Sequence, residues 1–445
     1  MPIVTSFLKL CNYVCSSSIV KKNIVAGGFL SLLVKTGSTL LGFISVVILA
    51  RTLGAEDYGI YTFVISVVTL IALPTQLGLP QLIVRESAKY YDKKDYPSLK
   101  SLWKWSTKLI AVTSLLVFAI AIISYSFFND SFEDDFLEPL LLATILIPII
   151  ALSNVRGAAL RGLGHTIMGQ FPESIIRPSC LTLFAGLSFL ITDQLTVYDA
   201  VKIHIFAAII GYFVGGWILY INKPSKLSVV KSSRSRNREW IMSALPLAII
   251  SGLQLINNQS DIIMLTLYRS PEEVGVYKVV SSICTLVIFG FMAVQIVLSP
   301  KIAILYSNGD VKALNDLIKV GTRTIIIIAL PVFFVLVVFG EWILETTFGS
   351  EYVSGYLPLM ILSVGRLINA AFGLTTVLLN MTSNEKINMR IVMLSAALNI
   401  LLNFIFIPLM GMSGAAITTV VTLAIWNISS WFAVKKKLKI KVSPF

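Results

Sequence analysis

Charged residues are scarce in this chain of 445 residues, since Asp, Glu, Lys and Arg together make up 13% of it. Hydrophobic residues make up 56%, and the mean hydropathy is +0.84. A soluble globular domain carries roughly 25% charged residues. The composition therefore excludes that class and indicates an integral membrane protein. Its apolar runs of about 20 residues predict membrane-spanning α-helices rather than barrel strands.

Histidine and the usual catalytic motifs are also nearly absent. The two histidines, His165 and His204, stand far apart, and the four cysteines form no CxxC pair. The sequence has no P-loop, no GxSxG elbow and no cluster with metal-ligand spacing. We therefore expect no catalytic residues, no metal, no cofactor and no enzyme activity, and a structural or interfacial role for each histidine.

A stretch of sequence recurs in the second half of the chain. The segment Leu49–Leu70 aligns without a gap with Leu265–Leu286, 216 residues later. A long-period repeat of this kind indicates two similar halves. Eight pairs are identical: Leu49/Leu265, Glu56/Glu272, Gly59/Gly275, Tyr61/Tyr277, Val64/Val280, Ser66/Ser282, Thr69/Thr285 and Leu70/Leu286.

Hydropathy predicts twelve membrane-spanning helices, six in each parallel repeat. The expected domains are an N-terminal six-helix lobe (1–222), a basic cytoplasmic linker (223–239), a C-terminal six-helix lobe (240–434) and a basic cytoplasmic tail (435–445), with a cavity between the lobes. The predicted spans are 27–50, 58–80, 108–128, 137–155, 172–192, 201–221, 241–268, 274–299, 321–340, 356–380, 387–407 and 413–434.

The basic residues are distributed unevenly over the loops between these spans. Of the 36 lysines and arginines, 29 fall on the side of the N-terminus, Arg156 and Arg161 among them, whereas the opposite loops are acidic. The positive-inside rule therefore predicts a multi-pass protein with both termini in the cytoplasm. The same rule accounts for the net charge of +13, so nucleic acid is not an expected partner.

Polar residues line up on single faces of several predicted spans. Lys35, Ser38, Gly42 and Ser45 follow helical spacing, and the same register recurs 216 residues later. An ionised side chain in a span costs about 2.5–3.5 kcal/mol on insertion scales, so such residues suggest function. The candidate cavity residues are Lys35, Arg366, Lys278, Asp261, Gln254, Asn258, Asn369 and Asn399.

These polar faces have two explanations, which the sequence leaves open. They are hydrogen-bonding contacts between helices, or they line a water-filled cavity. Contacts between helices do not require the full charges of Lys35, Lys278 and Arg366, which favours the cavity for these three. Against the single carboxylate of Asp261 they leave a net positive charge that would attract an anion. The alternative is that Lys278 snorkels outward and the other two are ion-paired.

The run Ala50–Gly59, ARTLGAEDYG, resembles a family signature. It is similar to the A-R-x-L-G-x-x-x-Y-G turn of bacterial polysaccharide flippases, within the multidrug/oligosaccharidyl-lipid/polysaccharide exporter superfamily. The resemblance implies alternating access in the bacterial inner membrane. It implies as substrate an undecaprenyl-pyrophosphate-linked oligosaccharide, of O-antigen or a related surface polysaccharide, with Lys35, Lys278 and Arg366 at its charged groups. The implied partners are this lipid-linked substrate and the bilayer; other polysaccharide assembly proteins are candidates.

Two other functions remain open. A cation-coupled multidrug antiporter of the same fold would prefer a more acidic or aromatic cavity, and only Asp261 fits that expectation. A membrane glycosyltransferase or polymerase would be expected to carry a large outer loop with catalytic carboxylates, whereas the outer loops predicted here are short.

Overall fold

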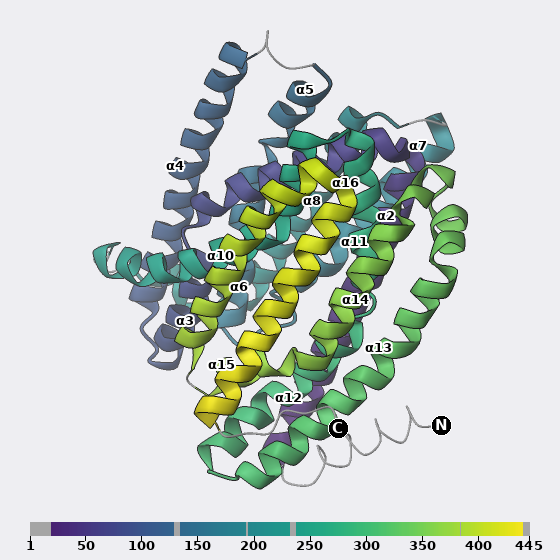
Figure 1. Cartoon of the computed structure of the whole chain (residues 1–445). Helices are drawn as coiled ribbons and strands as arrows, with labels where there is room; N and C mark the ends of the chain where they lie inside the picture. Colours follow the sequence, from purple (N-terminus) through teal and green to yellow (C-terminus); the bar gives the residue numbers. More distant parts are fainter. Residues whose placement is uncertain (1–18, 129–133, 193–194, 232–236, 383, 439–445) are drawn as a thin grey trace. The chain divides into compact units, whose positions relative to one another are not determined.

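The computed structural model describes residues 19–128, 134–192, 195–231, 237–382 and 384–438, and all regular elements in these ranges are helical. The predicted all-α fold is therefore confirmed (Figure 1). The elements are α2 (Ile19–Gln76), α3 (Leu79–Asp92), α4 (Tyr96–Phe128), α5 (Asp134–Ala143), α6 (Leu146–Gly162), the π-helix η1 (Pro172–Ile176), α7 (Arg177–Thr192), α8 (Val197–Asn222), α9 (Lys226–Val229), α10 (Asn237–Tyr268), α11 (Pro271–Cys284), α12 (Phe289–Ser307), α13 (Val311–Thr347), the 3-10 helix η2 (Ser350–Gly355), α14 (Tyr356–Phe372), α15 (Leu374–Met381) and α16 (Glu385–Leu438).

The chain divides into two compact units. One runs from Val34 to Gln259, and the other comprises Ser260–Phe445 with Met1–Leu33. They are called here the N unit and the C unit. Helix α10 contributes to both, since its first part belongs to the N unit and its end to the C unit. The lobe boundaries drawn from the sequence stay a prediction.

Ten helices in the described ranges are long and apolar enough to cross a membrane. Two of them, α2 and α16, are interrupted by glycines with positive φ, at Gly54 (φ 75°) and Gly411 (φ 57°). L side chains rarely adopt this conformation, which suits glycine at a chain reversal. In α16, Ser395 Oγ donates to the carbonyl of Thr422 at 3.2 Å, so its two arms lie side by side (Figure 1). Dividing both helices at these glycines would give twelve spans, the number that the sequence predicts. The number twelve stays a prediction.

Several predicted boundaries were wrong. The predicted span 274–299 is two helices, α11 and α12, and Arg156 and Arg161 lie inside α6 rather than in a loop. Small residues explain why α6 continues past Val155. Gly162 lies so close to α3 that an added Cβ would touch the Ser87 side chain. The two arginines were assigned to a loop because they are charged, although α6 packs closely against α3 and stays helical there.

The core at one end of the N unit is formed by α3, α4, α6 and the start of α10. Buried residues from these helices include Leu82, Leu102 and Ala158. Two indoles that pack here also find polar partners, because Trp103 Nε1 donates to Ser87 Oγ at 3.0 Å and Trp240 Nε1 donates to the Tyr90 hydroxyl at 3.3 Å. Indoles with hydrogen-bond partners of this kind fix α4 and α10 against α3. This packing positions α4 and α6, which carry the basic side chains described below.

Candidate functional site

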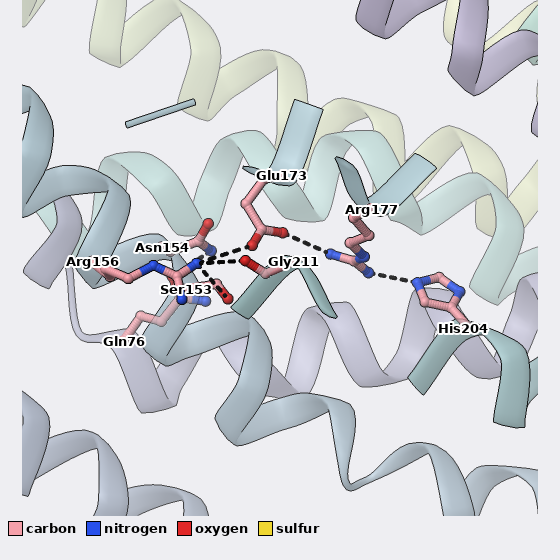
Figure 2. Close-up of polar contacts among 8 residues, drawn as sticks. All are labelled: Gln76, Ser153, Asn154, Arg156, Glu173, Arg177, His204 and Gly211. Atoms are coloured by element: carbon pink, nitrogen blue, oxygen red, sulfur yellow. Dashed lines mark hydrogen bonds and ion pairs between the residues drawn. The ribbon is translucent and has the colours of Figure 1, made fainter. Parts of the chain in front are cut away.

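Arg156 is the centre of a polar cluster inside the N unit (Figure 2). Its side chain is 8% exposed. The guanidinium donates to the carbonyls of Tyr212 and, at 3.3 Å, Gly211 in α8, and its Nη2 lies 3.7 Å from Glu173 Oε1. Gly215 makes room for it, since an added Cβ there would overlap the guanidinium. A buried arginine is stable only with such partners.

The cluster continues from Glu173 to α2. Glu173 Oε2 lies 3.3 Å from Arg177 Nη1, and Arg177 Nη2 lies 2.5 Å from His204 Nε2. Arginine has no acceptor, so Nε2 accepts, and the neutral imidazole donates through Nδ1 to the Tyr61 hydroxyl at 2.6 Å. The cluster of Arg156, Glu173, Arg177, His204 and Tyr61, called here the N cluster, thus carries two arginines and one carboxylate.

A second cluster surrounds Asp261 in the C unit. This carboxylate is 8% exposed. Its Oδ1 accepts from Asn403 Nδ2 at 2.7 Å and Asn399 Nδ2 at 3.4 Å. Its Oδ2 accepts from the hydroxyls of Thr419 at 2.6 Å and Tyr277 at 2.9 Å. Four donors from α10's neighbours α11 and α16 therefore hold one negative charge, and this set is called here the C cluster.

The two clusters share a pattern of contacts. Tyr61 meets His204, 143 residues later, and Tyr277 meets Thr419, 142 residues later at 3.5 Å. Ser45 Oγ lies 2.6 Å from Thr182 Oγ1, 137 residues later, and Asp261 contacts Asn399, 138 residues later. Each residue of one pair stands 215 to 217 positions from its counterpart in the other. The sequence repeat is therefore also a repeat of tertiary hydrogen bonds.

The C cluster offers the oxygen ligands that hard cations take. Besides the Asp261 carboxylate, the amide Oδ1 of Asn403 is buried without a hydrogen-bond partner. Carboxylate, amide and hydroxyl oxygens are the ligands of such ions. In the described part of the chain no three His, Cys, Asp or Glu side chains form a metal-binding group. A cation held here would therefore rely mainly on neutral oxygens.

The eight candidate residues from the sequence are not gathered in one place. Asp261 and Asn399 are in direct contact. Arg366 is half-buried in α14. Lys278 and Asn369 are half-buried in α11 and α14. Lys35, Gln254 and Asn258 are exposed and belong to the N unit.

Lys35, Lys278 and Arg366 were proposed to line a cavity. None of them takes part in the salt bridges found among the described residues. Arg366 Nε is in addition buried without a hydrogen-bond partner. Asp261, the expected partner of these cations, is instead satisfied by four neutral donors. The contacts of the described residues therefore do not support the alternative in which Lys35 and Arg366 are ion-paired.

The N cluster was missed in the sequence. One signal was available, because Glu173 and Arg177 stand at i and i+4 in an otherwise apolar run, a spacing that places opposite charges side by side on a helix. Arg156 had been assigned to a loop. The expectation for His204 was a structural or interfacial role, and the histidine is buried between Tyr61 and Arg177.

A family model described as "Polysaccharide biosynthesis protein" matches residues 24–305. The chain belongs to this family. A second model, MatE, matches residues 246–405. With the ten apolar helices, the match identifies a multi-pass membrane protein of the flippase and transporter superfamily named above, and the resemblance read from the ARTLGAEDYG run is confirmed.

Relatives and solved structures agree with this assignment. The chain is 23% identical over 390 residues to the probable low-salt glycan biosynthesis flippase Agl15 of Haloferax volcanii, covering 86% of this chain and 78% of the relative. It is 24% identical to the lipid II flippase MurJ of Bacillus subtilis, covering 86% and 77%. An inward-facing multidrug resistance MATE family transporter shares the fold, with a TM-score of 0.76, 15% identity and coverage of 90% and 94%. These matches point to transporters rather than enzymes.

Proposed function

We propose that this protein moves an undecaprenyl-pyrophosphate-linked oligosaccharide, the repeat unit of O-antigen or a related surface polysaccharide, across the bacterial inner membrane by alternating access. Two relatives that align over most of the chain are named as flippases, one for glycan biosynthesis and one for lipid II. The two repeated units supply the parts that such a mechanism moves against each other. Both termini would lie in the cytoplasm.

The main support for this class of substrate is the environment of Arg366. Its Nε is buried without a hydrogen-bond partner, and no ion pair in the described ranges includes it. An arginine in a membrane-spanning helix is costly unless it meets an anion. A guanidinium can bind two phosphate oxygens at once, which suits a pyrophosphate better than a neutral or cationic drug.

The other candidate residues extend this assignment. Lys35 and Lys278 would add point charges for the pyrophosphate or for acidic sugars, and fixed cations offset part of the cost of removing the phosphate charges from water. Gln254, Asn258, Asn369 and Asn399 would hydrogen-bond sugar hydroxyls. In this assignment the polyprenyl tail stays in the bilayer during transport.

The test is transport of a fluorescent polyprenyl-pyrophosphate oligosaccharide in proteoliposomes, together with surface polysaccharide in cells that lack the native gene. We expect Arg366→Ala to lower the initial transport rate at least about tenfold, since loss of a charge-assisted hydrogen bond costs roughly 1.5–3 kcal/mol. Arg366→Lys should retain part of the rate, because the charge survives without the bidentate geometry. Lys35→Ala should be milder, and Lys278→Ala the mildest.

Arg323→Ala is the matched control, because Arg323 is an exposed arginine of the same unit, on α13. It should transport at the wild-type rate. Normal transport by both Arg366→Ala and Lys35→Ala, at equal protein levels, would refute the anion-binding assignment and leave these charges a structural role.

A cation-coupled multidrug antiporter is the second candidate function. It is favoured by the C cluster, in which oxygen ligands surround the buried Asp261, and by the MatE match over residues 246–405. The same proteoliposomes discriminate between the two candidates. Efflux of cationic drugs driven by a sodium or proton gradient, with no movement of the lipid-linked sugar, would establish the antiporter.

A further inference from the structure

A cavity of about 1120 Å³ lies within the N unit, between α4, α6 and α8, and reaches Leu227 of α9. It is separate from the polar faces predicted in the sequence, because none of the eight candidate residues lines it. Its wall combines basic side chains with aromatic rings. Neither the family assignment nor the proposed transport function explains this combination.

The basic side chains come from two helices. Lys100, Lys104 and Lys108 are spaced four residues apart on one face of α4, and Arg156 enters from α6. Among the described residues that line the cavity, none is an aspartate or glutamate. Arg156 is 8% exposed, and its Nε is buried without a hydrogen-bond partner. A wall of four cations without a lining carboxylate favours a negatively charged occupant.

The aromatic side of the cavity belongs to α8. Phe213, Trp217 and Tyr220 line it, and each is exposed; for Trp217 the exposed fraction is 69%. Exposed tryptophan and tyrosine beside lysines are typical of the level of lipid headgroups. The loop charges predict that this end of the N unit is cytoplasmic, where basic pockets between membrane helices bind anionic headgroups.

We propose that this cavity binds the phosphate headgroup of an anionic bilayer phospholipid. Lys104, Lys108 and Arg156 contact the phosphate, and the acyl chains run along the exposed aromatic face of α8. At about 1120 Å³ the cavity is larger than a free phosphate ion needs and leaves room for the glycerol of a headgroup. Arg156 also belongs to the N cluster, so the bound lipid adds a charge partner to the ion pairs with Glu173. The inference does not depend on which substrate is transported.

The experiment uses the full-length protein in detergent, titrated with phosphatidylglycerol and followed by native mass spectrometry. We expect Lys104→Gln/Lys108→Gln to weaken phosphatidylglycerol binding roughly thirty-fold, from the contribution of each basic residue near an anionic surface. Lys104→Arg/Lys108→Arg should bind like the wild type. The matched control is Lys89→Gln/Lys93→Gln, which removes two exposed lysines from α3 and the turn after it and should leave binding unchanged.

Two further variants test the aromatic face. Trp217→Ala should weaken phosphatidylglycerol binding several-fold, whereas Trp342→Ala, which removes an exposed tryptophan from α13 of the C unit, should not. A lipid-dependent rise in the apparent Tm of the wild type, absent from Lys104→Gln/Lys108→Gln, would support the same site with an independent readout.

Competing ligands identify the source of the phosphate. Phosphatidylcholine should bind far more weakly than phosphatidylglycerol, and millimolar inorganic phosphate should not displace the lipid. Equal binding by the two glutamine double variants would overturn the proposal. So would displacement by inorganic phosphate alone, or a clear preference for undecaprenyl pyrophosphate, which would make the cavity part of the substrate path.

Discussion

The two polar clusters share the position of one tyrosine contact and have opposite chemistry. Each is held by one tyrosine, Tyr61 in the N cluster and Tyr277 in the C cluster, that meets a polar residue 142 or 143 positions later. In the N cluster the tyrosine ends a chain of ion pairs with two arginines and one carboxylate. In the C cluster it donates to a carboxylate that has only neutral partners in the described contacts.

The difference predicts different responses of the two clusters to substitution. The ion pairs of Arg156 and Arg177 with Glu173 link α6, η1 and α7 and rigidify the bundle, and they leave one net positive charge. A carboxylate held by neutral donors keeps its negative charge, and the orphaned Asn403 Oδ1 beside it adds an acceptor. We therefore expect substitutions in the N cluster to act mainly on stability, and the C cluster to respond to cations.

The largest effect on stability is expected from Glu173→Gln. It leaves Arg156 and Arg177 without their shared carboxylate, and breaking a buried ion pair costs roughly 3–5 kcal/mol. We expect about 3 kcal/mol, because the Glu173 side chain is 24% exposed. The measurement is the apparent Tm of the purified protein in detergent.

Glu86→Gln is the matched control for that variant. Glu86, itself 13% exposed, also forms two ion pairs, with Arg85 and Lys89, but both of these partners are 55% exposed, whereas Arg156 and Arg177 are 8% and 21% exposed. Surface pairs contribute about 0.2–1 kcal/mol each. An equal fall in Tm for the two variants would show that the N cluster is no more structural than a surface pair.

The sequence predicted the helical fold and the repeat but only part of the site. Tyr61 and Tyr277 were paired in the alignment, and Asp261 and Asn399 were both named, because polar residues stand out in apolar helices. That Asp261 meets Asn399 and Thr419 together, rather than a cation, depends on how α16 folds back at Gly411, which periodicity does not encode. Arg156 was assigned to a loop because a basic residue near the end of a membrane helix usually marks its cytoplasmic side. In the structure, Gly215 leaves room for the buried guanidinium.

Gly215→Ala breaks the N cluster from the backbone side, with an intermediate effect. The added Cβ would overlap the Arg156 guanidinium and push it away from the carbonyls of α8. Overpacking of this kind costs roughly 1–3 kcal/mol. Gly216→Ala is the control, because a Cβ there meets nothing within 4 Å, and alanine in a helix is favoured over glycine by about 0.5–1 kcal/mol. The two neighbours should thus shift the apparent Tm in opposite directions, and a shared direction would contradict the close approach.

The smallest effects are expected from Tyr61→Phe and Tyr277→Phe, which remove one hydroxyl from equivalent positions. Tyr277 donates to the charged Asp261, and hydrogen bonds to charged groups contribute roughly 1.5–3 kcal/mol. The lower end applies because Thr419 and two asparagines still hold the carboxylate. Tyr61 accepts from a neutral imidazole, and a bond of that kind contributes about 0.5–1.5 kcal/mol. Tyr277→Phe should therefore lower the apparent Tm more than Tyr61→Phe. If sodium binds at the C cluster, adding it should reduce the difference between these two Tm shifts. A larger fall for Tyr61→Phe, in the presence or absence of sodium, would mean that the carboxylate is not the charged centre that distinguishes the two clusters.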